Sequence, residues 1–302
     1  MTTTTSADPA VQVRDLRKTY GTKRAVDGVD LEVHRGEVVA VLGPNGAGKT
    51  TTVEILEGYR RRDGGDVRVL GTDPARGDRA WRARIGVVLQ SAGDLAELTV
   101  REQLHHFARY YPAARDPEEV LDAVGLTDKA RTRSRQLSGG QRRRLDVALG
   151  ILGRPELLFL DEPTTGFDPH ARRAFWDLVL RLRDEGTTIL LTTHYLDEAA
   201  YLADRVVVVA AGRVVAHGAP HTLGGEDARR PTVHWVEDGA PRSVRTDRPT
   251  AVVAALAGRL PGEVPGLQVV RPSLEDVYLE LIAAAEPAPD PADPRPLETV
   301  TR

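Results

Sequence analysis

The chain contains 302 residues, enough for one large domain and a small one, and its formal net charge is −3. This charge argues against a nucleic-acid-binding protein that relies on overall positive charge, and the lack of cysteine excludes disulfides, iron–sulfur ligation and thiolate zinc sites. The longest purely apolar run in the second half, residues 206–211, is far shorter than the roughly 20 residues that span a bilayer, so we expect no membrane-spanning segment.

The first ten residues, MTTTTSADPA, contain neither a basic stretch nor an apolar segment. We therefore expect no secretory signal and a cytoplasmic location, with residues 1–9 disordered. From Val11 to Val41 apolar and polar residues alternate between glycines, a pattern that predicts short strands separated by turns.

The sequence GPNGAGKT, which begins at Gly43, fits the phosphate-loop pattern G-x-x-x-x-G-K-[ST]. It lies between the apolar strand EVVAVL and the helical sequence TTVEILEG, as such a loop requires. Lys49 would reach the β- and γ-phosphates and the hydroxyl of Thr50 would bind Mg²⁺, whereas the alternative is a glycine-rich turn before an ordinary helix. The nucleotide-binding set predicted from this stretch is Gly43, Pro44, Asn45, Gly46, Ala47, Gly48, Lys49, Thr50 and Thr51.

Two sequences of helical periodicity follow, VREQLHHFARYY and EEVLDAVGL. Next comes LSGGQRRRLDVALGIL at residues 137–152, in which a serine and two glycines precede a polar, basic helical turn. The exposed N–H groups and the positive end of the helix dipole at this helix start would suit an anion. We interpret the arginine run 142–144 as a solvated helix face rather than as a substrate site.

Two carboxylates end the buried strand LLFLDEP. Asp161 is predicted to bind Mg²⁺, and Glu162 to accept a proton from water that attacks a γ-phosphate; the alternative is a solvated acidic turn before a proline. The helix ARRAFWDLVLRLRDEG and the apolar strands TTILLTTH and DRVVVVAAGRVVAHG then complete an alternation of strands and helices. This order predicts a largely parallel α/β core with helices on both faces.

The pattern changes at a glycine-rich linker near residue 224. The sequences TVHWVED, SVRTD, TAVVAALAGRL, LQVVR and SLEDVYLELIAAA predict a small C-terminal α/β module over residues 225–285. Ser273 and Asp276 have the spacing of a helix cap. Residues 286–302 include five prolines within ten residues and few apolar side chains, so we expect this tail to be disordered.

Together these motifs resemble the nucleotide-binding subunit of ABC transporters, and LSGGQ matches that family's signature sequence. The resemblance covers about Val11 to Leu223 with the motifs in the family's order. It implies a P-loop NTPase fold of the ABC type: a nucleotide-binding domain over residues 10–224, with a helical subdomain at about 91–136, that binds ATP and Mg²⁺ and hydrolyses the ATP.

The resemblance also implies further site residues. Tyr20 lies where the family has an aromatic ring that stacks on adenine, and Gln90 matches the glutamine that contacts Mg²⁺ and the attacking water. His194 matches the histidine that contacts the γ-phosphate. Asp168 lies in the loop that crosses to the partner subunit, where this sequence has GFD and the family usually has SALD. The plainer alternatives are packing at a sheet edge for Tyr20, a polar strand end for Gln90 and a helix cap for His194.

In the family two such subunits pack head to tail, and each signature helix closes over the ATP held by the other. The resemblance therefore implies a homodimer in which Ser138, Gly139, Gly140 and Gln141 bind the partner's γ-phosphate. The family's helical subdomain also receives a membrane partner. A separate permease is thus expected to hold this chain at the inner face of the cell membrane.

The sequence RPSLEDVYLELI resembles the accessory domain of drug-resistance exporter ATPases of the daunorubicin type, which implies export of drugs or other hydrophobic compounds. A soluble ABC ATPase, such as an iron–sulfur assembly ATPase, is the alternative, though it would not need the C-terminal module. A twin-cassette translation factor would need two phosphate loops, and a DNA-repair ATPase would need long heptad segments or cysteine zinc modules, none of which occurs in this sequence.

Overall fold

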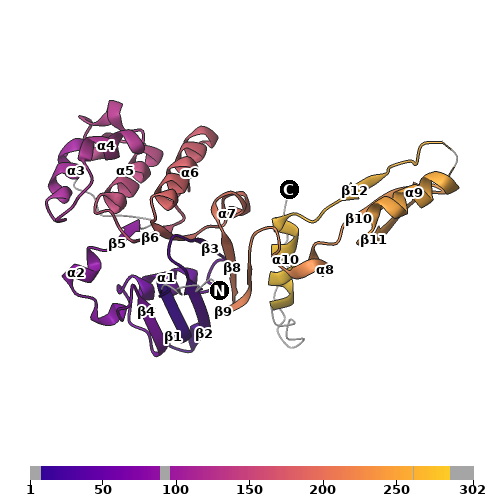
Figure 1. Cartoon of the computed structure of the whole chain (residues 1–302), viewed down its shortest axis with the longest axis horizontal. Helices are drawn as coiled ribbons and strands as arrows, with labels where there is room; N and C mark the ends of the chain where they lie inside the picture. Colours follow the sequence, from indigo (N-terminus) through magenta and orange to yellow (C-terminus); the bar gives the residue numbers. More distant parts are fainter. Residues whose placement is uncertain (1–7, 89–95, 261, 286–302) are drawn as a thin grey trace, which may run out of the picture.

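A computed structural model describes residues 8–88, 96–260 and 262–285, whose strands form three sheets (Figure 1). The largest sheet has the strand order β5-β6-β7-β3-β8-β9. Its neighbours pair in parallel except β8 and β9, which form an antiparallel hairpin, so the predicted largely parallel α/β core is confirmed. The bounds are β3 Val38–Leu42, β5 Ile85–Val88, β6 Leu157–Asp161, β7 Thr188–Thr192, β8 Arg205–Ala210 and β9 Arg213–Gly218.

Side chains of the central strands alternate between two apolar cores, because successive residues of a strand point to opposite faces of the sheet. In β3, Val39 and Val41 lie in the core shared with α1, whereas Val38 and Ala40 lie in the core shared with α5, α6 and α7. Both faces are therefore covered, as the continuous apolar strands require. These helices are α1 Lys49–Leu56, α5 Gly139–Ile151, α6 Pro169–Asp184 and α7 Leu196–Leu202.

A second, antiparallel sheet has the order β2-β1-β4 and packs with α1 on one face of the large sheet. Strands were expected between Val11 and Val41, and the structure divides them between the two sheets, since β3 joins the large one. Trp81 is buried beside this sheet and its indole Nε1 donates to the carbonyl of Val69 at 2.9 Å. The elements here are β1 Val11–Tyr20, β2 Lys23–Val33, β4 Gly64–Val69, the 3₁₀ turn Pro74–Arg76 and α2 Arg79–Arg82.

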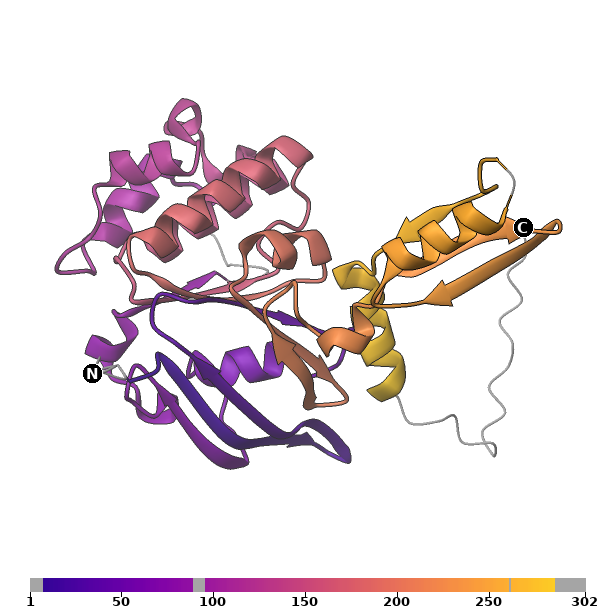
Figure 2. The same cartoon turned by 45° about the vertical axis from the view of Figure 1, so that its right-hand side comes forward.

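The short helices between β5 and α5 lie together at one end of the molecule (Figure 2). They are α3 Val100–Ala108, α4 Pro117–Ala123 and two 3₁₀ turns, Thr127–Lys129 and Ser134–Gln136. Leu104 of α3 and Leu121 of α4 are buried in the same core as Ile151 of α5. The two helices expected from the apolar periodicity are confirmed, and their packing explains why that periodicity exists. Residues 91–95 of the predicted helical subdomain lie outside the described residues.

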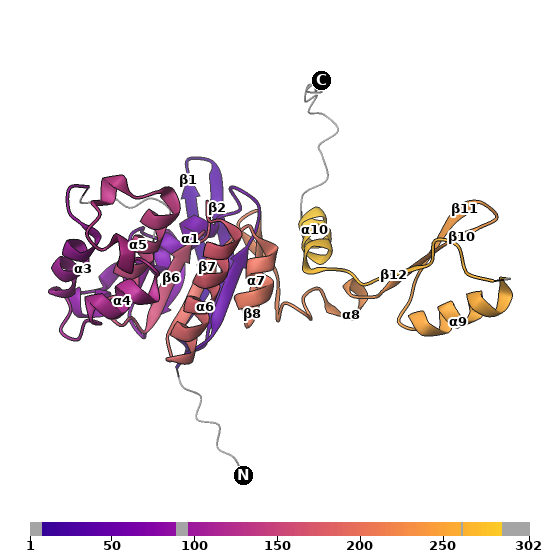
Figure 3. The same cartoon turned by 90° about the horizontal axis from the view of Figure 1, so that it is seen from above.

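The C-terminal elements include a small sheet of order β11-β10-β12. One helix, α9, packs on this sheet around the buried side chains of Val233, Leu256 and Val264. These elements project away from the large sheet (Figures 1 and 3). Their bounds are β10 Thr232–Glu237, β11 Ala240–Arg245, β12 Gln268–Val270 and α9 Pro249–Arg259, preceded by α8 Gly225–Ala228.

The last helix of the described residues, α10 (Leu274–Ala285), returns to the large domain. Leu274 and Val277 are buried in the core that also contains α7 and β8. The predicted cap is confirmed, because the N–H of Asp276 donates to Ser273 Oγ at 3.1 Å. The sequence-based division at residue 225 groups α10 with the C-terminal module, whereas its apolar face packs on the large domain.

Across the residues that the structure describes, every helix is too short or too polar to cross a membrane. The two terminal segments that we expected to be disordered lie outside the described residues, apart from residues 8 and 9.

We predict that Val277→Ala lowers the free energy of unfolding of the large domain by about 1–3 kcal/mol, because it leaves a cavity in a packed core. The matched control is Leu279→Ala in the same helix, where the side chain is 56% exposed and the expected change is below about 0.5 kcal/mol. Urea unfolding of the full chain measures both. Equal effects of the two substitutions would show that α10 does not pack on the large domain in solution.

Candidate functional site

At two positions, the loop between β3 and α1 lies so close to neighbouring strands that only glycine fits. A Cβ on Gly43 would lie 2.2 Å from the carbonyl oxygen of Val209, and a Cβ on Gly48 would lie 2.2 Å from that of Ala25. Gly48 also has φ +103°, a conformation that favours glycine. The loop is thus held against β2 and β8 and leads directly into α1, whose first N–H groups lack intrahelical acceptors. Such a cradle fits a phosphate group.

A pocket of about 630 Å³ opens at this loop. It brings together residues predicted from separate parts of the sequence, namely the phosphate loop, the end of β1, the end of β6 and the end of β7. The residues that line it are Tyr20, Lys23, Ala25, Asn45, Gly46, Gly48, Lys49, Thr50, Thr51, Glu162 and His194. Lys23 and Ala25 were not predicted, because no local motif marks the start of β2 as part of a pocket.

Lys49 is buried at the base of the loop. Its Nζ donates to the carbonyl oxygens of Gly43 at 2.6 Å and Pro44 at 3.0 Å. An ammonium group has three donors, so one more is available for an anion. Burial lowers the pKa of the Lys49 ammonium, and the negative charges of Glu162 and Asp161 oppose that shift. The loop therefore places one buried ammonium group at the pocket. Gly43 and Pro44 hold this group although, like Ala47, they do not line the pocket themselves.

The two predicted carboxylates lie where β6 ends, and the hydroxyl of Thr192 bonds the side chain of Asp161 and the backbone of Glu162. Thr192 Oγ1 donates to Asp161 Oδ1 and accepts from the N–H of Glu162 at 3.2 Å. Glu162 Oε1 lies 3.3 Å from Nδ1 of His194, so these two side chains meet at the pocket wall. His194 does not cap α7, because that helix has no side-chain cap. The alternative interpretation of His194 as a helix cap is therefore excluded.

An adjoining pocket of about 660 Å³ contains the candidate metal ligands Thr50 and Asp161. Their hydroxyl and carboxylate oxygens suit Mg²⁺. Glu57, at the end of α1, also lines this pocket; burial and the nearby charges of Asp161 and Glu54 raise the pKa of its carboxyl to about 8. No group of three acidic or histidine side chains in the described ranges could hold a metal ion. A Mg²⁺ ion here would need phosphate oxygens as well. Gln90, the third predicted metal ligand, lies outside the described residues.

Tyr20 lies at the end of β1 and lines the nucleotide pocket with 40% of its surface exposed. The side-chain cations of Lys18 and Arg60 lie 5.5 and 5.4 Å from its ring centroid. The ring is therefore open to a ligand rather than enclosed at a sheet edge. Its stacking on adenine remains a prediction.

The signature residues lie away from the pocket of their own chain. Ser138 caps α5: the N–H of Gln141 donates to Ser138 Oγ at 3.3 Å, and the N–H of Ser138 donates to Gln141 Oε1 at 3.0 Å. Gly139 and Gly140 form the first turn of this helix. The four residues form a capped helix start in which Gly139 is exposed and Gly140 is half-buried, and such a start suits a phosphate that comes from outside the chain.

Asp168 also lies outside the pocket and caps α6. The N–H of Ala171 donates to Asp168 Oδ1 at 2.8 Å, and this hydrogen bond holds the pKa of the Asp168 carboxyl below its usual range. Helix capping is thus the interaction that the structure shows for Asp168. Its contact with a partner's nucleotide remains a prediction.

The interpretation of residues 142–144 as a solvated face is wrong for Arg143, which is only 7% exposed. Arg143 lies on the same face of α5 as Val147 and Ile151, which helical periodicity directs into the core. Its guanidinium Nε donates to the carbonyl of Pro163 at 3.2 Å, and its Nη2 donates to the carbonyl of Asp161. These two acceptors explain how an arginine is accommodated there.

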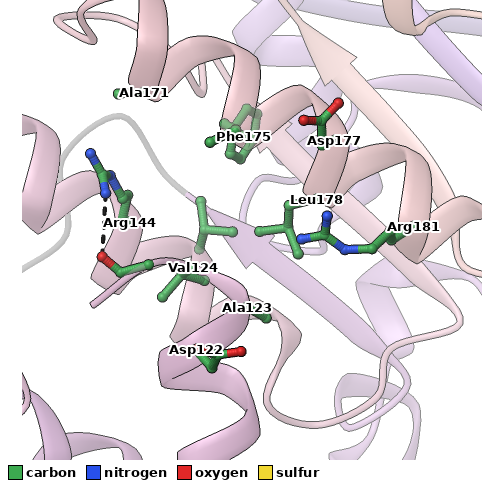
Figure 4. A pocket seen from close by; sticks show the side chains of 12 residues that line it. Asp122, Ala123, Val124, Arg144, Ala171, Phe175, Asp177, Leu178 and Arg181 are labelled. Atoms are coloured by element: carbon green, nitrogen blue, oxygen red, sulfur yellow. Dashed lines mark hydrogen bonds between the residues drawn. The ribbon is translucent and has the colours of Figure 1, made fainter. Parts of the chain in front are cut away.

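A separate cavity of about 220 Å³ lies between α4, α5 and α6 (Figure 4). Phe175 and Leu178 of α6 and Val124 form apolar walls, with Arg144 and Arg181 among the charged residues around them. None of the described residues assigned to the nucleotide site lines this cavity. This cavity is therefore separate from the predicted nucleotide site.

Comparison with known sequences agrees with this geometry. The profile of the family described as "ABC transporter" matches residues 26–165. The "Daunorubicin/doxorubicin resistance ATP-binding protein DrrA" of Streptomyces peucetius is 41% identical over 96% of this chain and 95% of that protein. The "Daunorubicin resistance ATP-binding protein DrrA3" of Streptomyces coeruleorubidus is 49% identical over 73% and 71%. The "Nod factor export ATP-binding protein I" of Rhizobium sp. (strain N33) is 39% identical over 90% and 96%.

Solved structures give the same result for the fold. An ATP-binding subunit of an ABC transporter superposes with a TM-score of 0.67, is 25% identical, and covers 90% of this chain and 99% of its own. A dimeric ATP-binding cassette in a post-hydrolysis state, bound to ADP and Pi, superposes with a TM-score of 0.64, is 25% identical, and covers 69% and 98%. The predicted fold class is therefore confirmed.

We predict that Gly48→Ala weakens ATP binding by about tenfold or more, because the added methyl group meets the Ala25 carbonyl and displaces the loop. The matched control is Gly36→Ala, which has a similar positive φ of 73° but no atom within 4 Å of the added Cβ. Titration with a fluorescent ATP analogue measures both affinities. If both variants bind ATP like the unmodified protein, the close approach of the loop is not required.

Proposed function

The chain belongs to the ABC transporter family as its ATP-binding and ATP-hydrolysing subunit, and on this basis we propose that it drives the export of drugs or other hydrophobic compounds. The observation that carries the proposal is the 41% identity to a daunorubicin/doxorubicin resistance protein over 96% of this chain. Export of such compounds would confer antibiotic resistance. A soluble ABC ATPase such as an iron–sulfur assembly ATPase is not favoured, because relatives that align over most of the chain carry resistance or export in their names.

ATP would bind with its phosphates at the Gly43–Gly48 loop. Lys49 offers its remaining N–H donor to the β- and γ-phosphates, and the free N–H groups at the start of α1 favour the same negative charge. Tyr20 borders the pocket, where its exposed ring could stack on adenine. The pocket thus offers a cationic end for the triphosphate and an aromatic side chain for the base.

Hydrolysis would use Glu162 as the general base, which accepts a proton from the attacking water. His194, 3.3 Å from Glu162 Oε1, would hold the γ-phosphate and orient the carboxylate. The proximity of both side chains to Lys49 in one pocket supports these roles. Gln90 would assist the water, a role proposed from the family resemblance alone.

Mg²⁺ would accompany ATP, with Thr50, Asp161 and Gln90 as protein ligands. When bound, the ion would neutralise negative charge on the phosphates. Thr50 and Asp161 border the same pocket, and their oxygen atoms are ligands that Mg²⁺ prefers.

The ATP sites would be shared between two copies of the chain. Ser138, Gly139, Gly140 and Gln141 would bind the γ-phosphate held by the partner, with Asp168 at the same interface. This proposal is supported by the position of the signature residues, which lie outside the pocket of their own chain and present a capped helix start. ATP binding would then draw two subunits together, and hydrolysis would loosen them.

A separate membrane permease would complete the transporter. The helices α3 and α4 would receive it, and the chain would lie at the cytoplasmic face of the cell membrane. Support comes from the family and from the described helices, which are too short or too polar to cross a membrane themselves. The signature helix α5 packs on α3 and α4, so force could pass between permease and nucleotide through that core.

We predict that Glu162→Gln slows hydrolysis by about 10²-fold or more, because a general base is lost, while the Kd for ATP stays within about twofold. Single-turnover hydrolysis and nucleotide titration measure the two quantities. Glu275→Gln, on an exposed turn of α10, is the matched control and should hydrolyse ATP at the unmodified rate. Unchanged single-turnover hydrolysis by Glu162→Gln would contradict the proposed base.

A mixed dimer tests whether the sites are shared. Lys49→Ala damages the phosphate loop and Ser138→Arg obstructs the signature, so neither variant should trap ATP as a homodimer. In a dimer with one of each, the intact loop of one chain faces the intact signature of the other, and one occluded ATP per dimer is expected.

Differently tagged chains allow the mixed dimer to be isolated, and retention of labelled ATP gives the readout. The two homodimers are the controls. Failure of well-folded mixed dimers to occlude ATP, under conditions where the unmodified protein does, would count against shared sites. Loss of ATP binding by monomeric Ser138→Arg would place the signature at its own chain's nucleotide.

A further inference from the structure

The backbone at Glu162 adopts a conformation that its own sequence does not favour. Its φ is +46°, in the left-handed region where a Cβ is unfavourable and glycine is the usual residue. For other residues the cost is of order 1 kcal/mol, so the conformation persists only where surrounding contacts hold it. The proposed base therefore depends on its neighbours for the direction of its carboxylate.

One side of this turn is held by β7. The N–H of Glu162 donates to the carbonyl of Thr192 at 3.0 Å and to its Oγ1 at 3.2 Å. This contact comes from the neighbouring strand and continues the pairing of β6 with β7. It fixes the N–H of Glu162 but leaves the carbonyls on either side of the residue to other donors.

The other side is held by Arg143, which comes from the signature helix. Its Nη2 donates to the carbonyl of Asp161 and its Nε to that of Pro163, so one guanidinium spans the residue between them. A guanidinium can do this because it is planar and carries several donors in a fixed fork. The side chain is 7% exposed, so water does not readily replace these bonds.

The charges around Arg143 also belong to the site. Burial lowers the pKa of its guanidinium, and the negative charges of Asp146, Asp161, Glu162 and Glu198 oppose this shift. Glu198, fully buried in α7, accepts from the indole of Trp176 at 3.1 Å. Arg143 thus carries positive charge into a region that contains the ends of β6 and β7.

We propose that Arg143 is a positioning residue, which holds the backbone on both sides of Glu162 and makes the direction of its carboxylate depend on the signature helix. This inference rests on the proposed roles of Glu162 and the signature. Arg143 lies only five residues after Ser138, about 7.5 Å along α5. A shift of the helix start therefore moves the guanidinium and the two carbonyls that it binds. Closure of one chain's signature on the partner's ATP would in this way set the carboxylate at that chain's own ATP.

The test compares Arg143→Met and Arg143→Lys in the full chain. Methionine keeps much of the apolar bulk but removes all donors, so we expect single-turnover hydrolysis to fall by about 10- to 100-fold, while the Kd for ATP stays within about threefold. Lysine keeps a cation without the rigid fork and should restore part of the rate. The control is Arg144→Met in the same helix, because the Arg144 guanidinium bonds Gly125 away from the pocket at 3.3 Å; its rate should stay within about twofold.

A double-mutant cycle separates this inference from the proposed function. If Arg143 acts through Glu162, the pair Arg143→Met with Glu162→Gln should hydrolyse ATP no more slowly than Glu162→Gln alone. Multiplied effects would overturn the positioning role and leave the base in place. Normal hydrolysis by Glu162→Gln alone would instead overturn the base, and the inference with it.

Two further results are decisive. A normal rate in folded Arg143→Met would overturn the inference, as would a loss of ATP affinity equal to the loss of rate. If Arg143→Met does not fold, Arg143→Lys decides: a reduced rate at unchanged affinity supports the positioning role, and an unmodified rate contradicts it.

Discussion

The nucleotide pocket depends on the close approach of the phosphate loop to the backbone of two neighbouring strands. Gly43 and Gly48 each leave room for a carbonyl oxygen that a Cβ would contact at 2.2 Å. With the loop pressed against β2 and β8, Lys49 can bond two loop carbonyls from beneath and retain a donor for phosphate. The position of the Lys49 ammonium thus depends on the packing of the loop backbone.

The parallel sheet supplies the two carboxylates and the histidine, because the carboxyl ends of its strands meet at one edge. Asp161 is the last residue of β6 and Glu162 follows it, and His194 lies just beyond β7, the strand beside β6. The loop after β3 lies at the same edge, since β3 pairs with β7. Chain segments more than a hundred residues apart therefore form one pocket without any long-range motif in the sequence.

The sequence predicted those parts of the site whose chemistry is local. The phosphate loop and the carboxylate pair are recognisable because glycine, lysine and acidic residues have fixed positions next to an apolar strand. The prediction that Arg143 is solvated was wrong, because arginine is normally exposed and its two carbonyl acceptors lie in a distant part of the sequence, at the end of β6. The apolar face of α10 was equally ambiguous: periodicity shows that Val277 is buried, but not whether the small module or the large domain buries it. Lys23 could not be predicted as a pocket residue, because only the pairing of β2 in its sheet brings it there.

In the proposed dimer, each ATP is held by the phosphate loop of one chain and the signature of the other. A structure of the full chain bound to a non-hydrolysable ATP analogue and Mg²⁺ tests it most directly. In a shared site the γ-phosphate lies within about 3 Å of both Lys49 Nζ and the Ser138 hydroxyl oxygen contributed by the partner subunit. A bound analogue contacted by Lys49 and Ser138 of the same chain, or one that lies away from the Gly43–Gly48 loop, would contradict it.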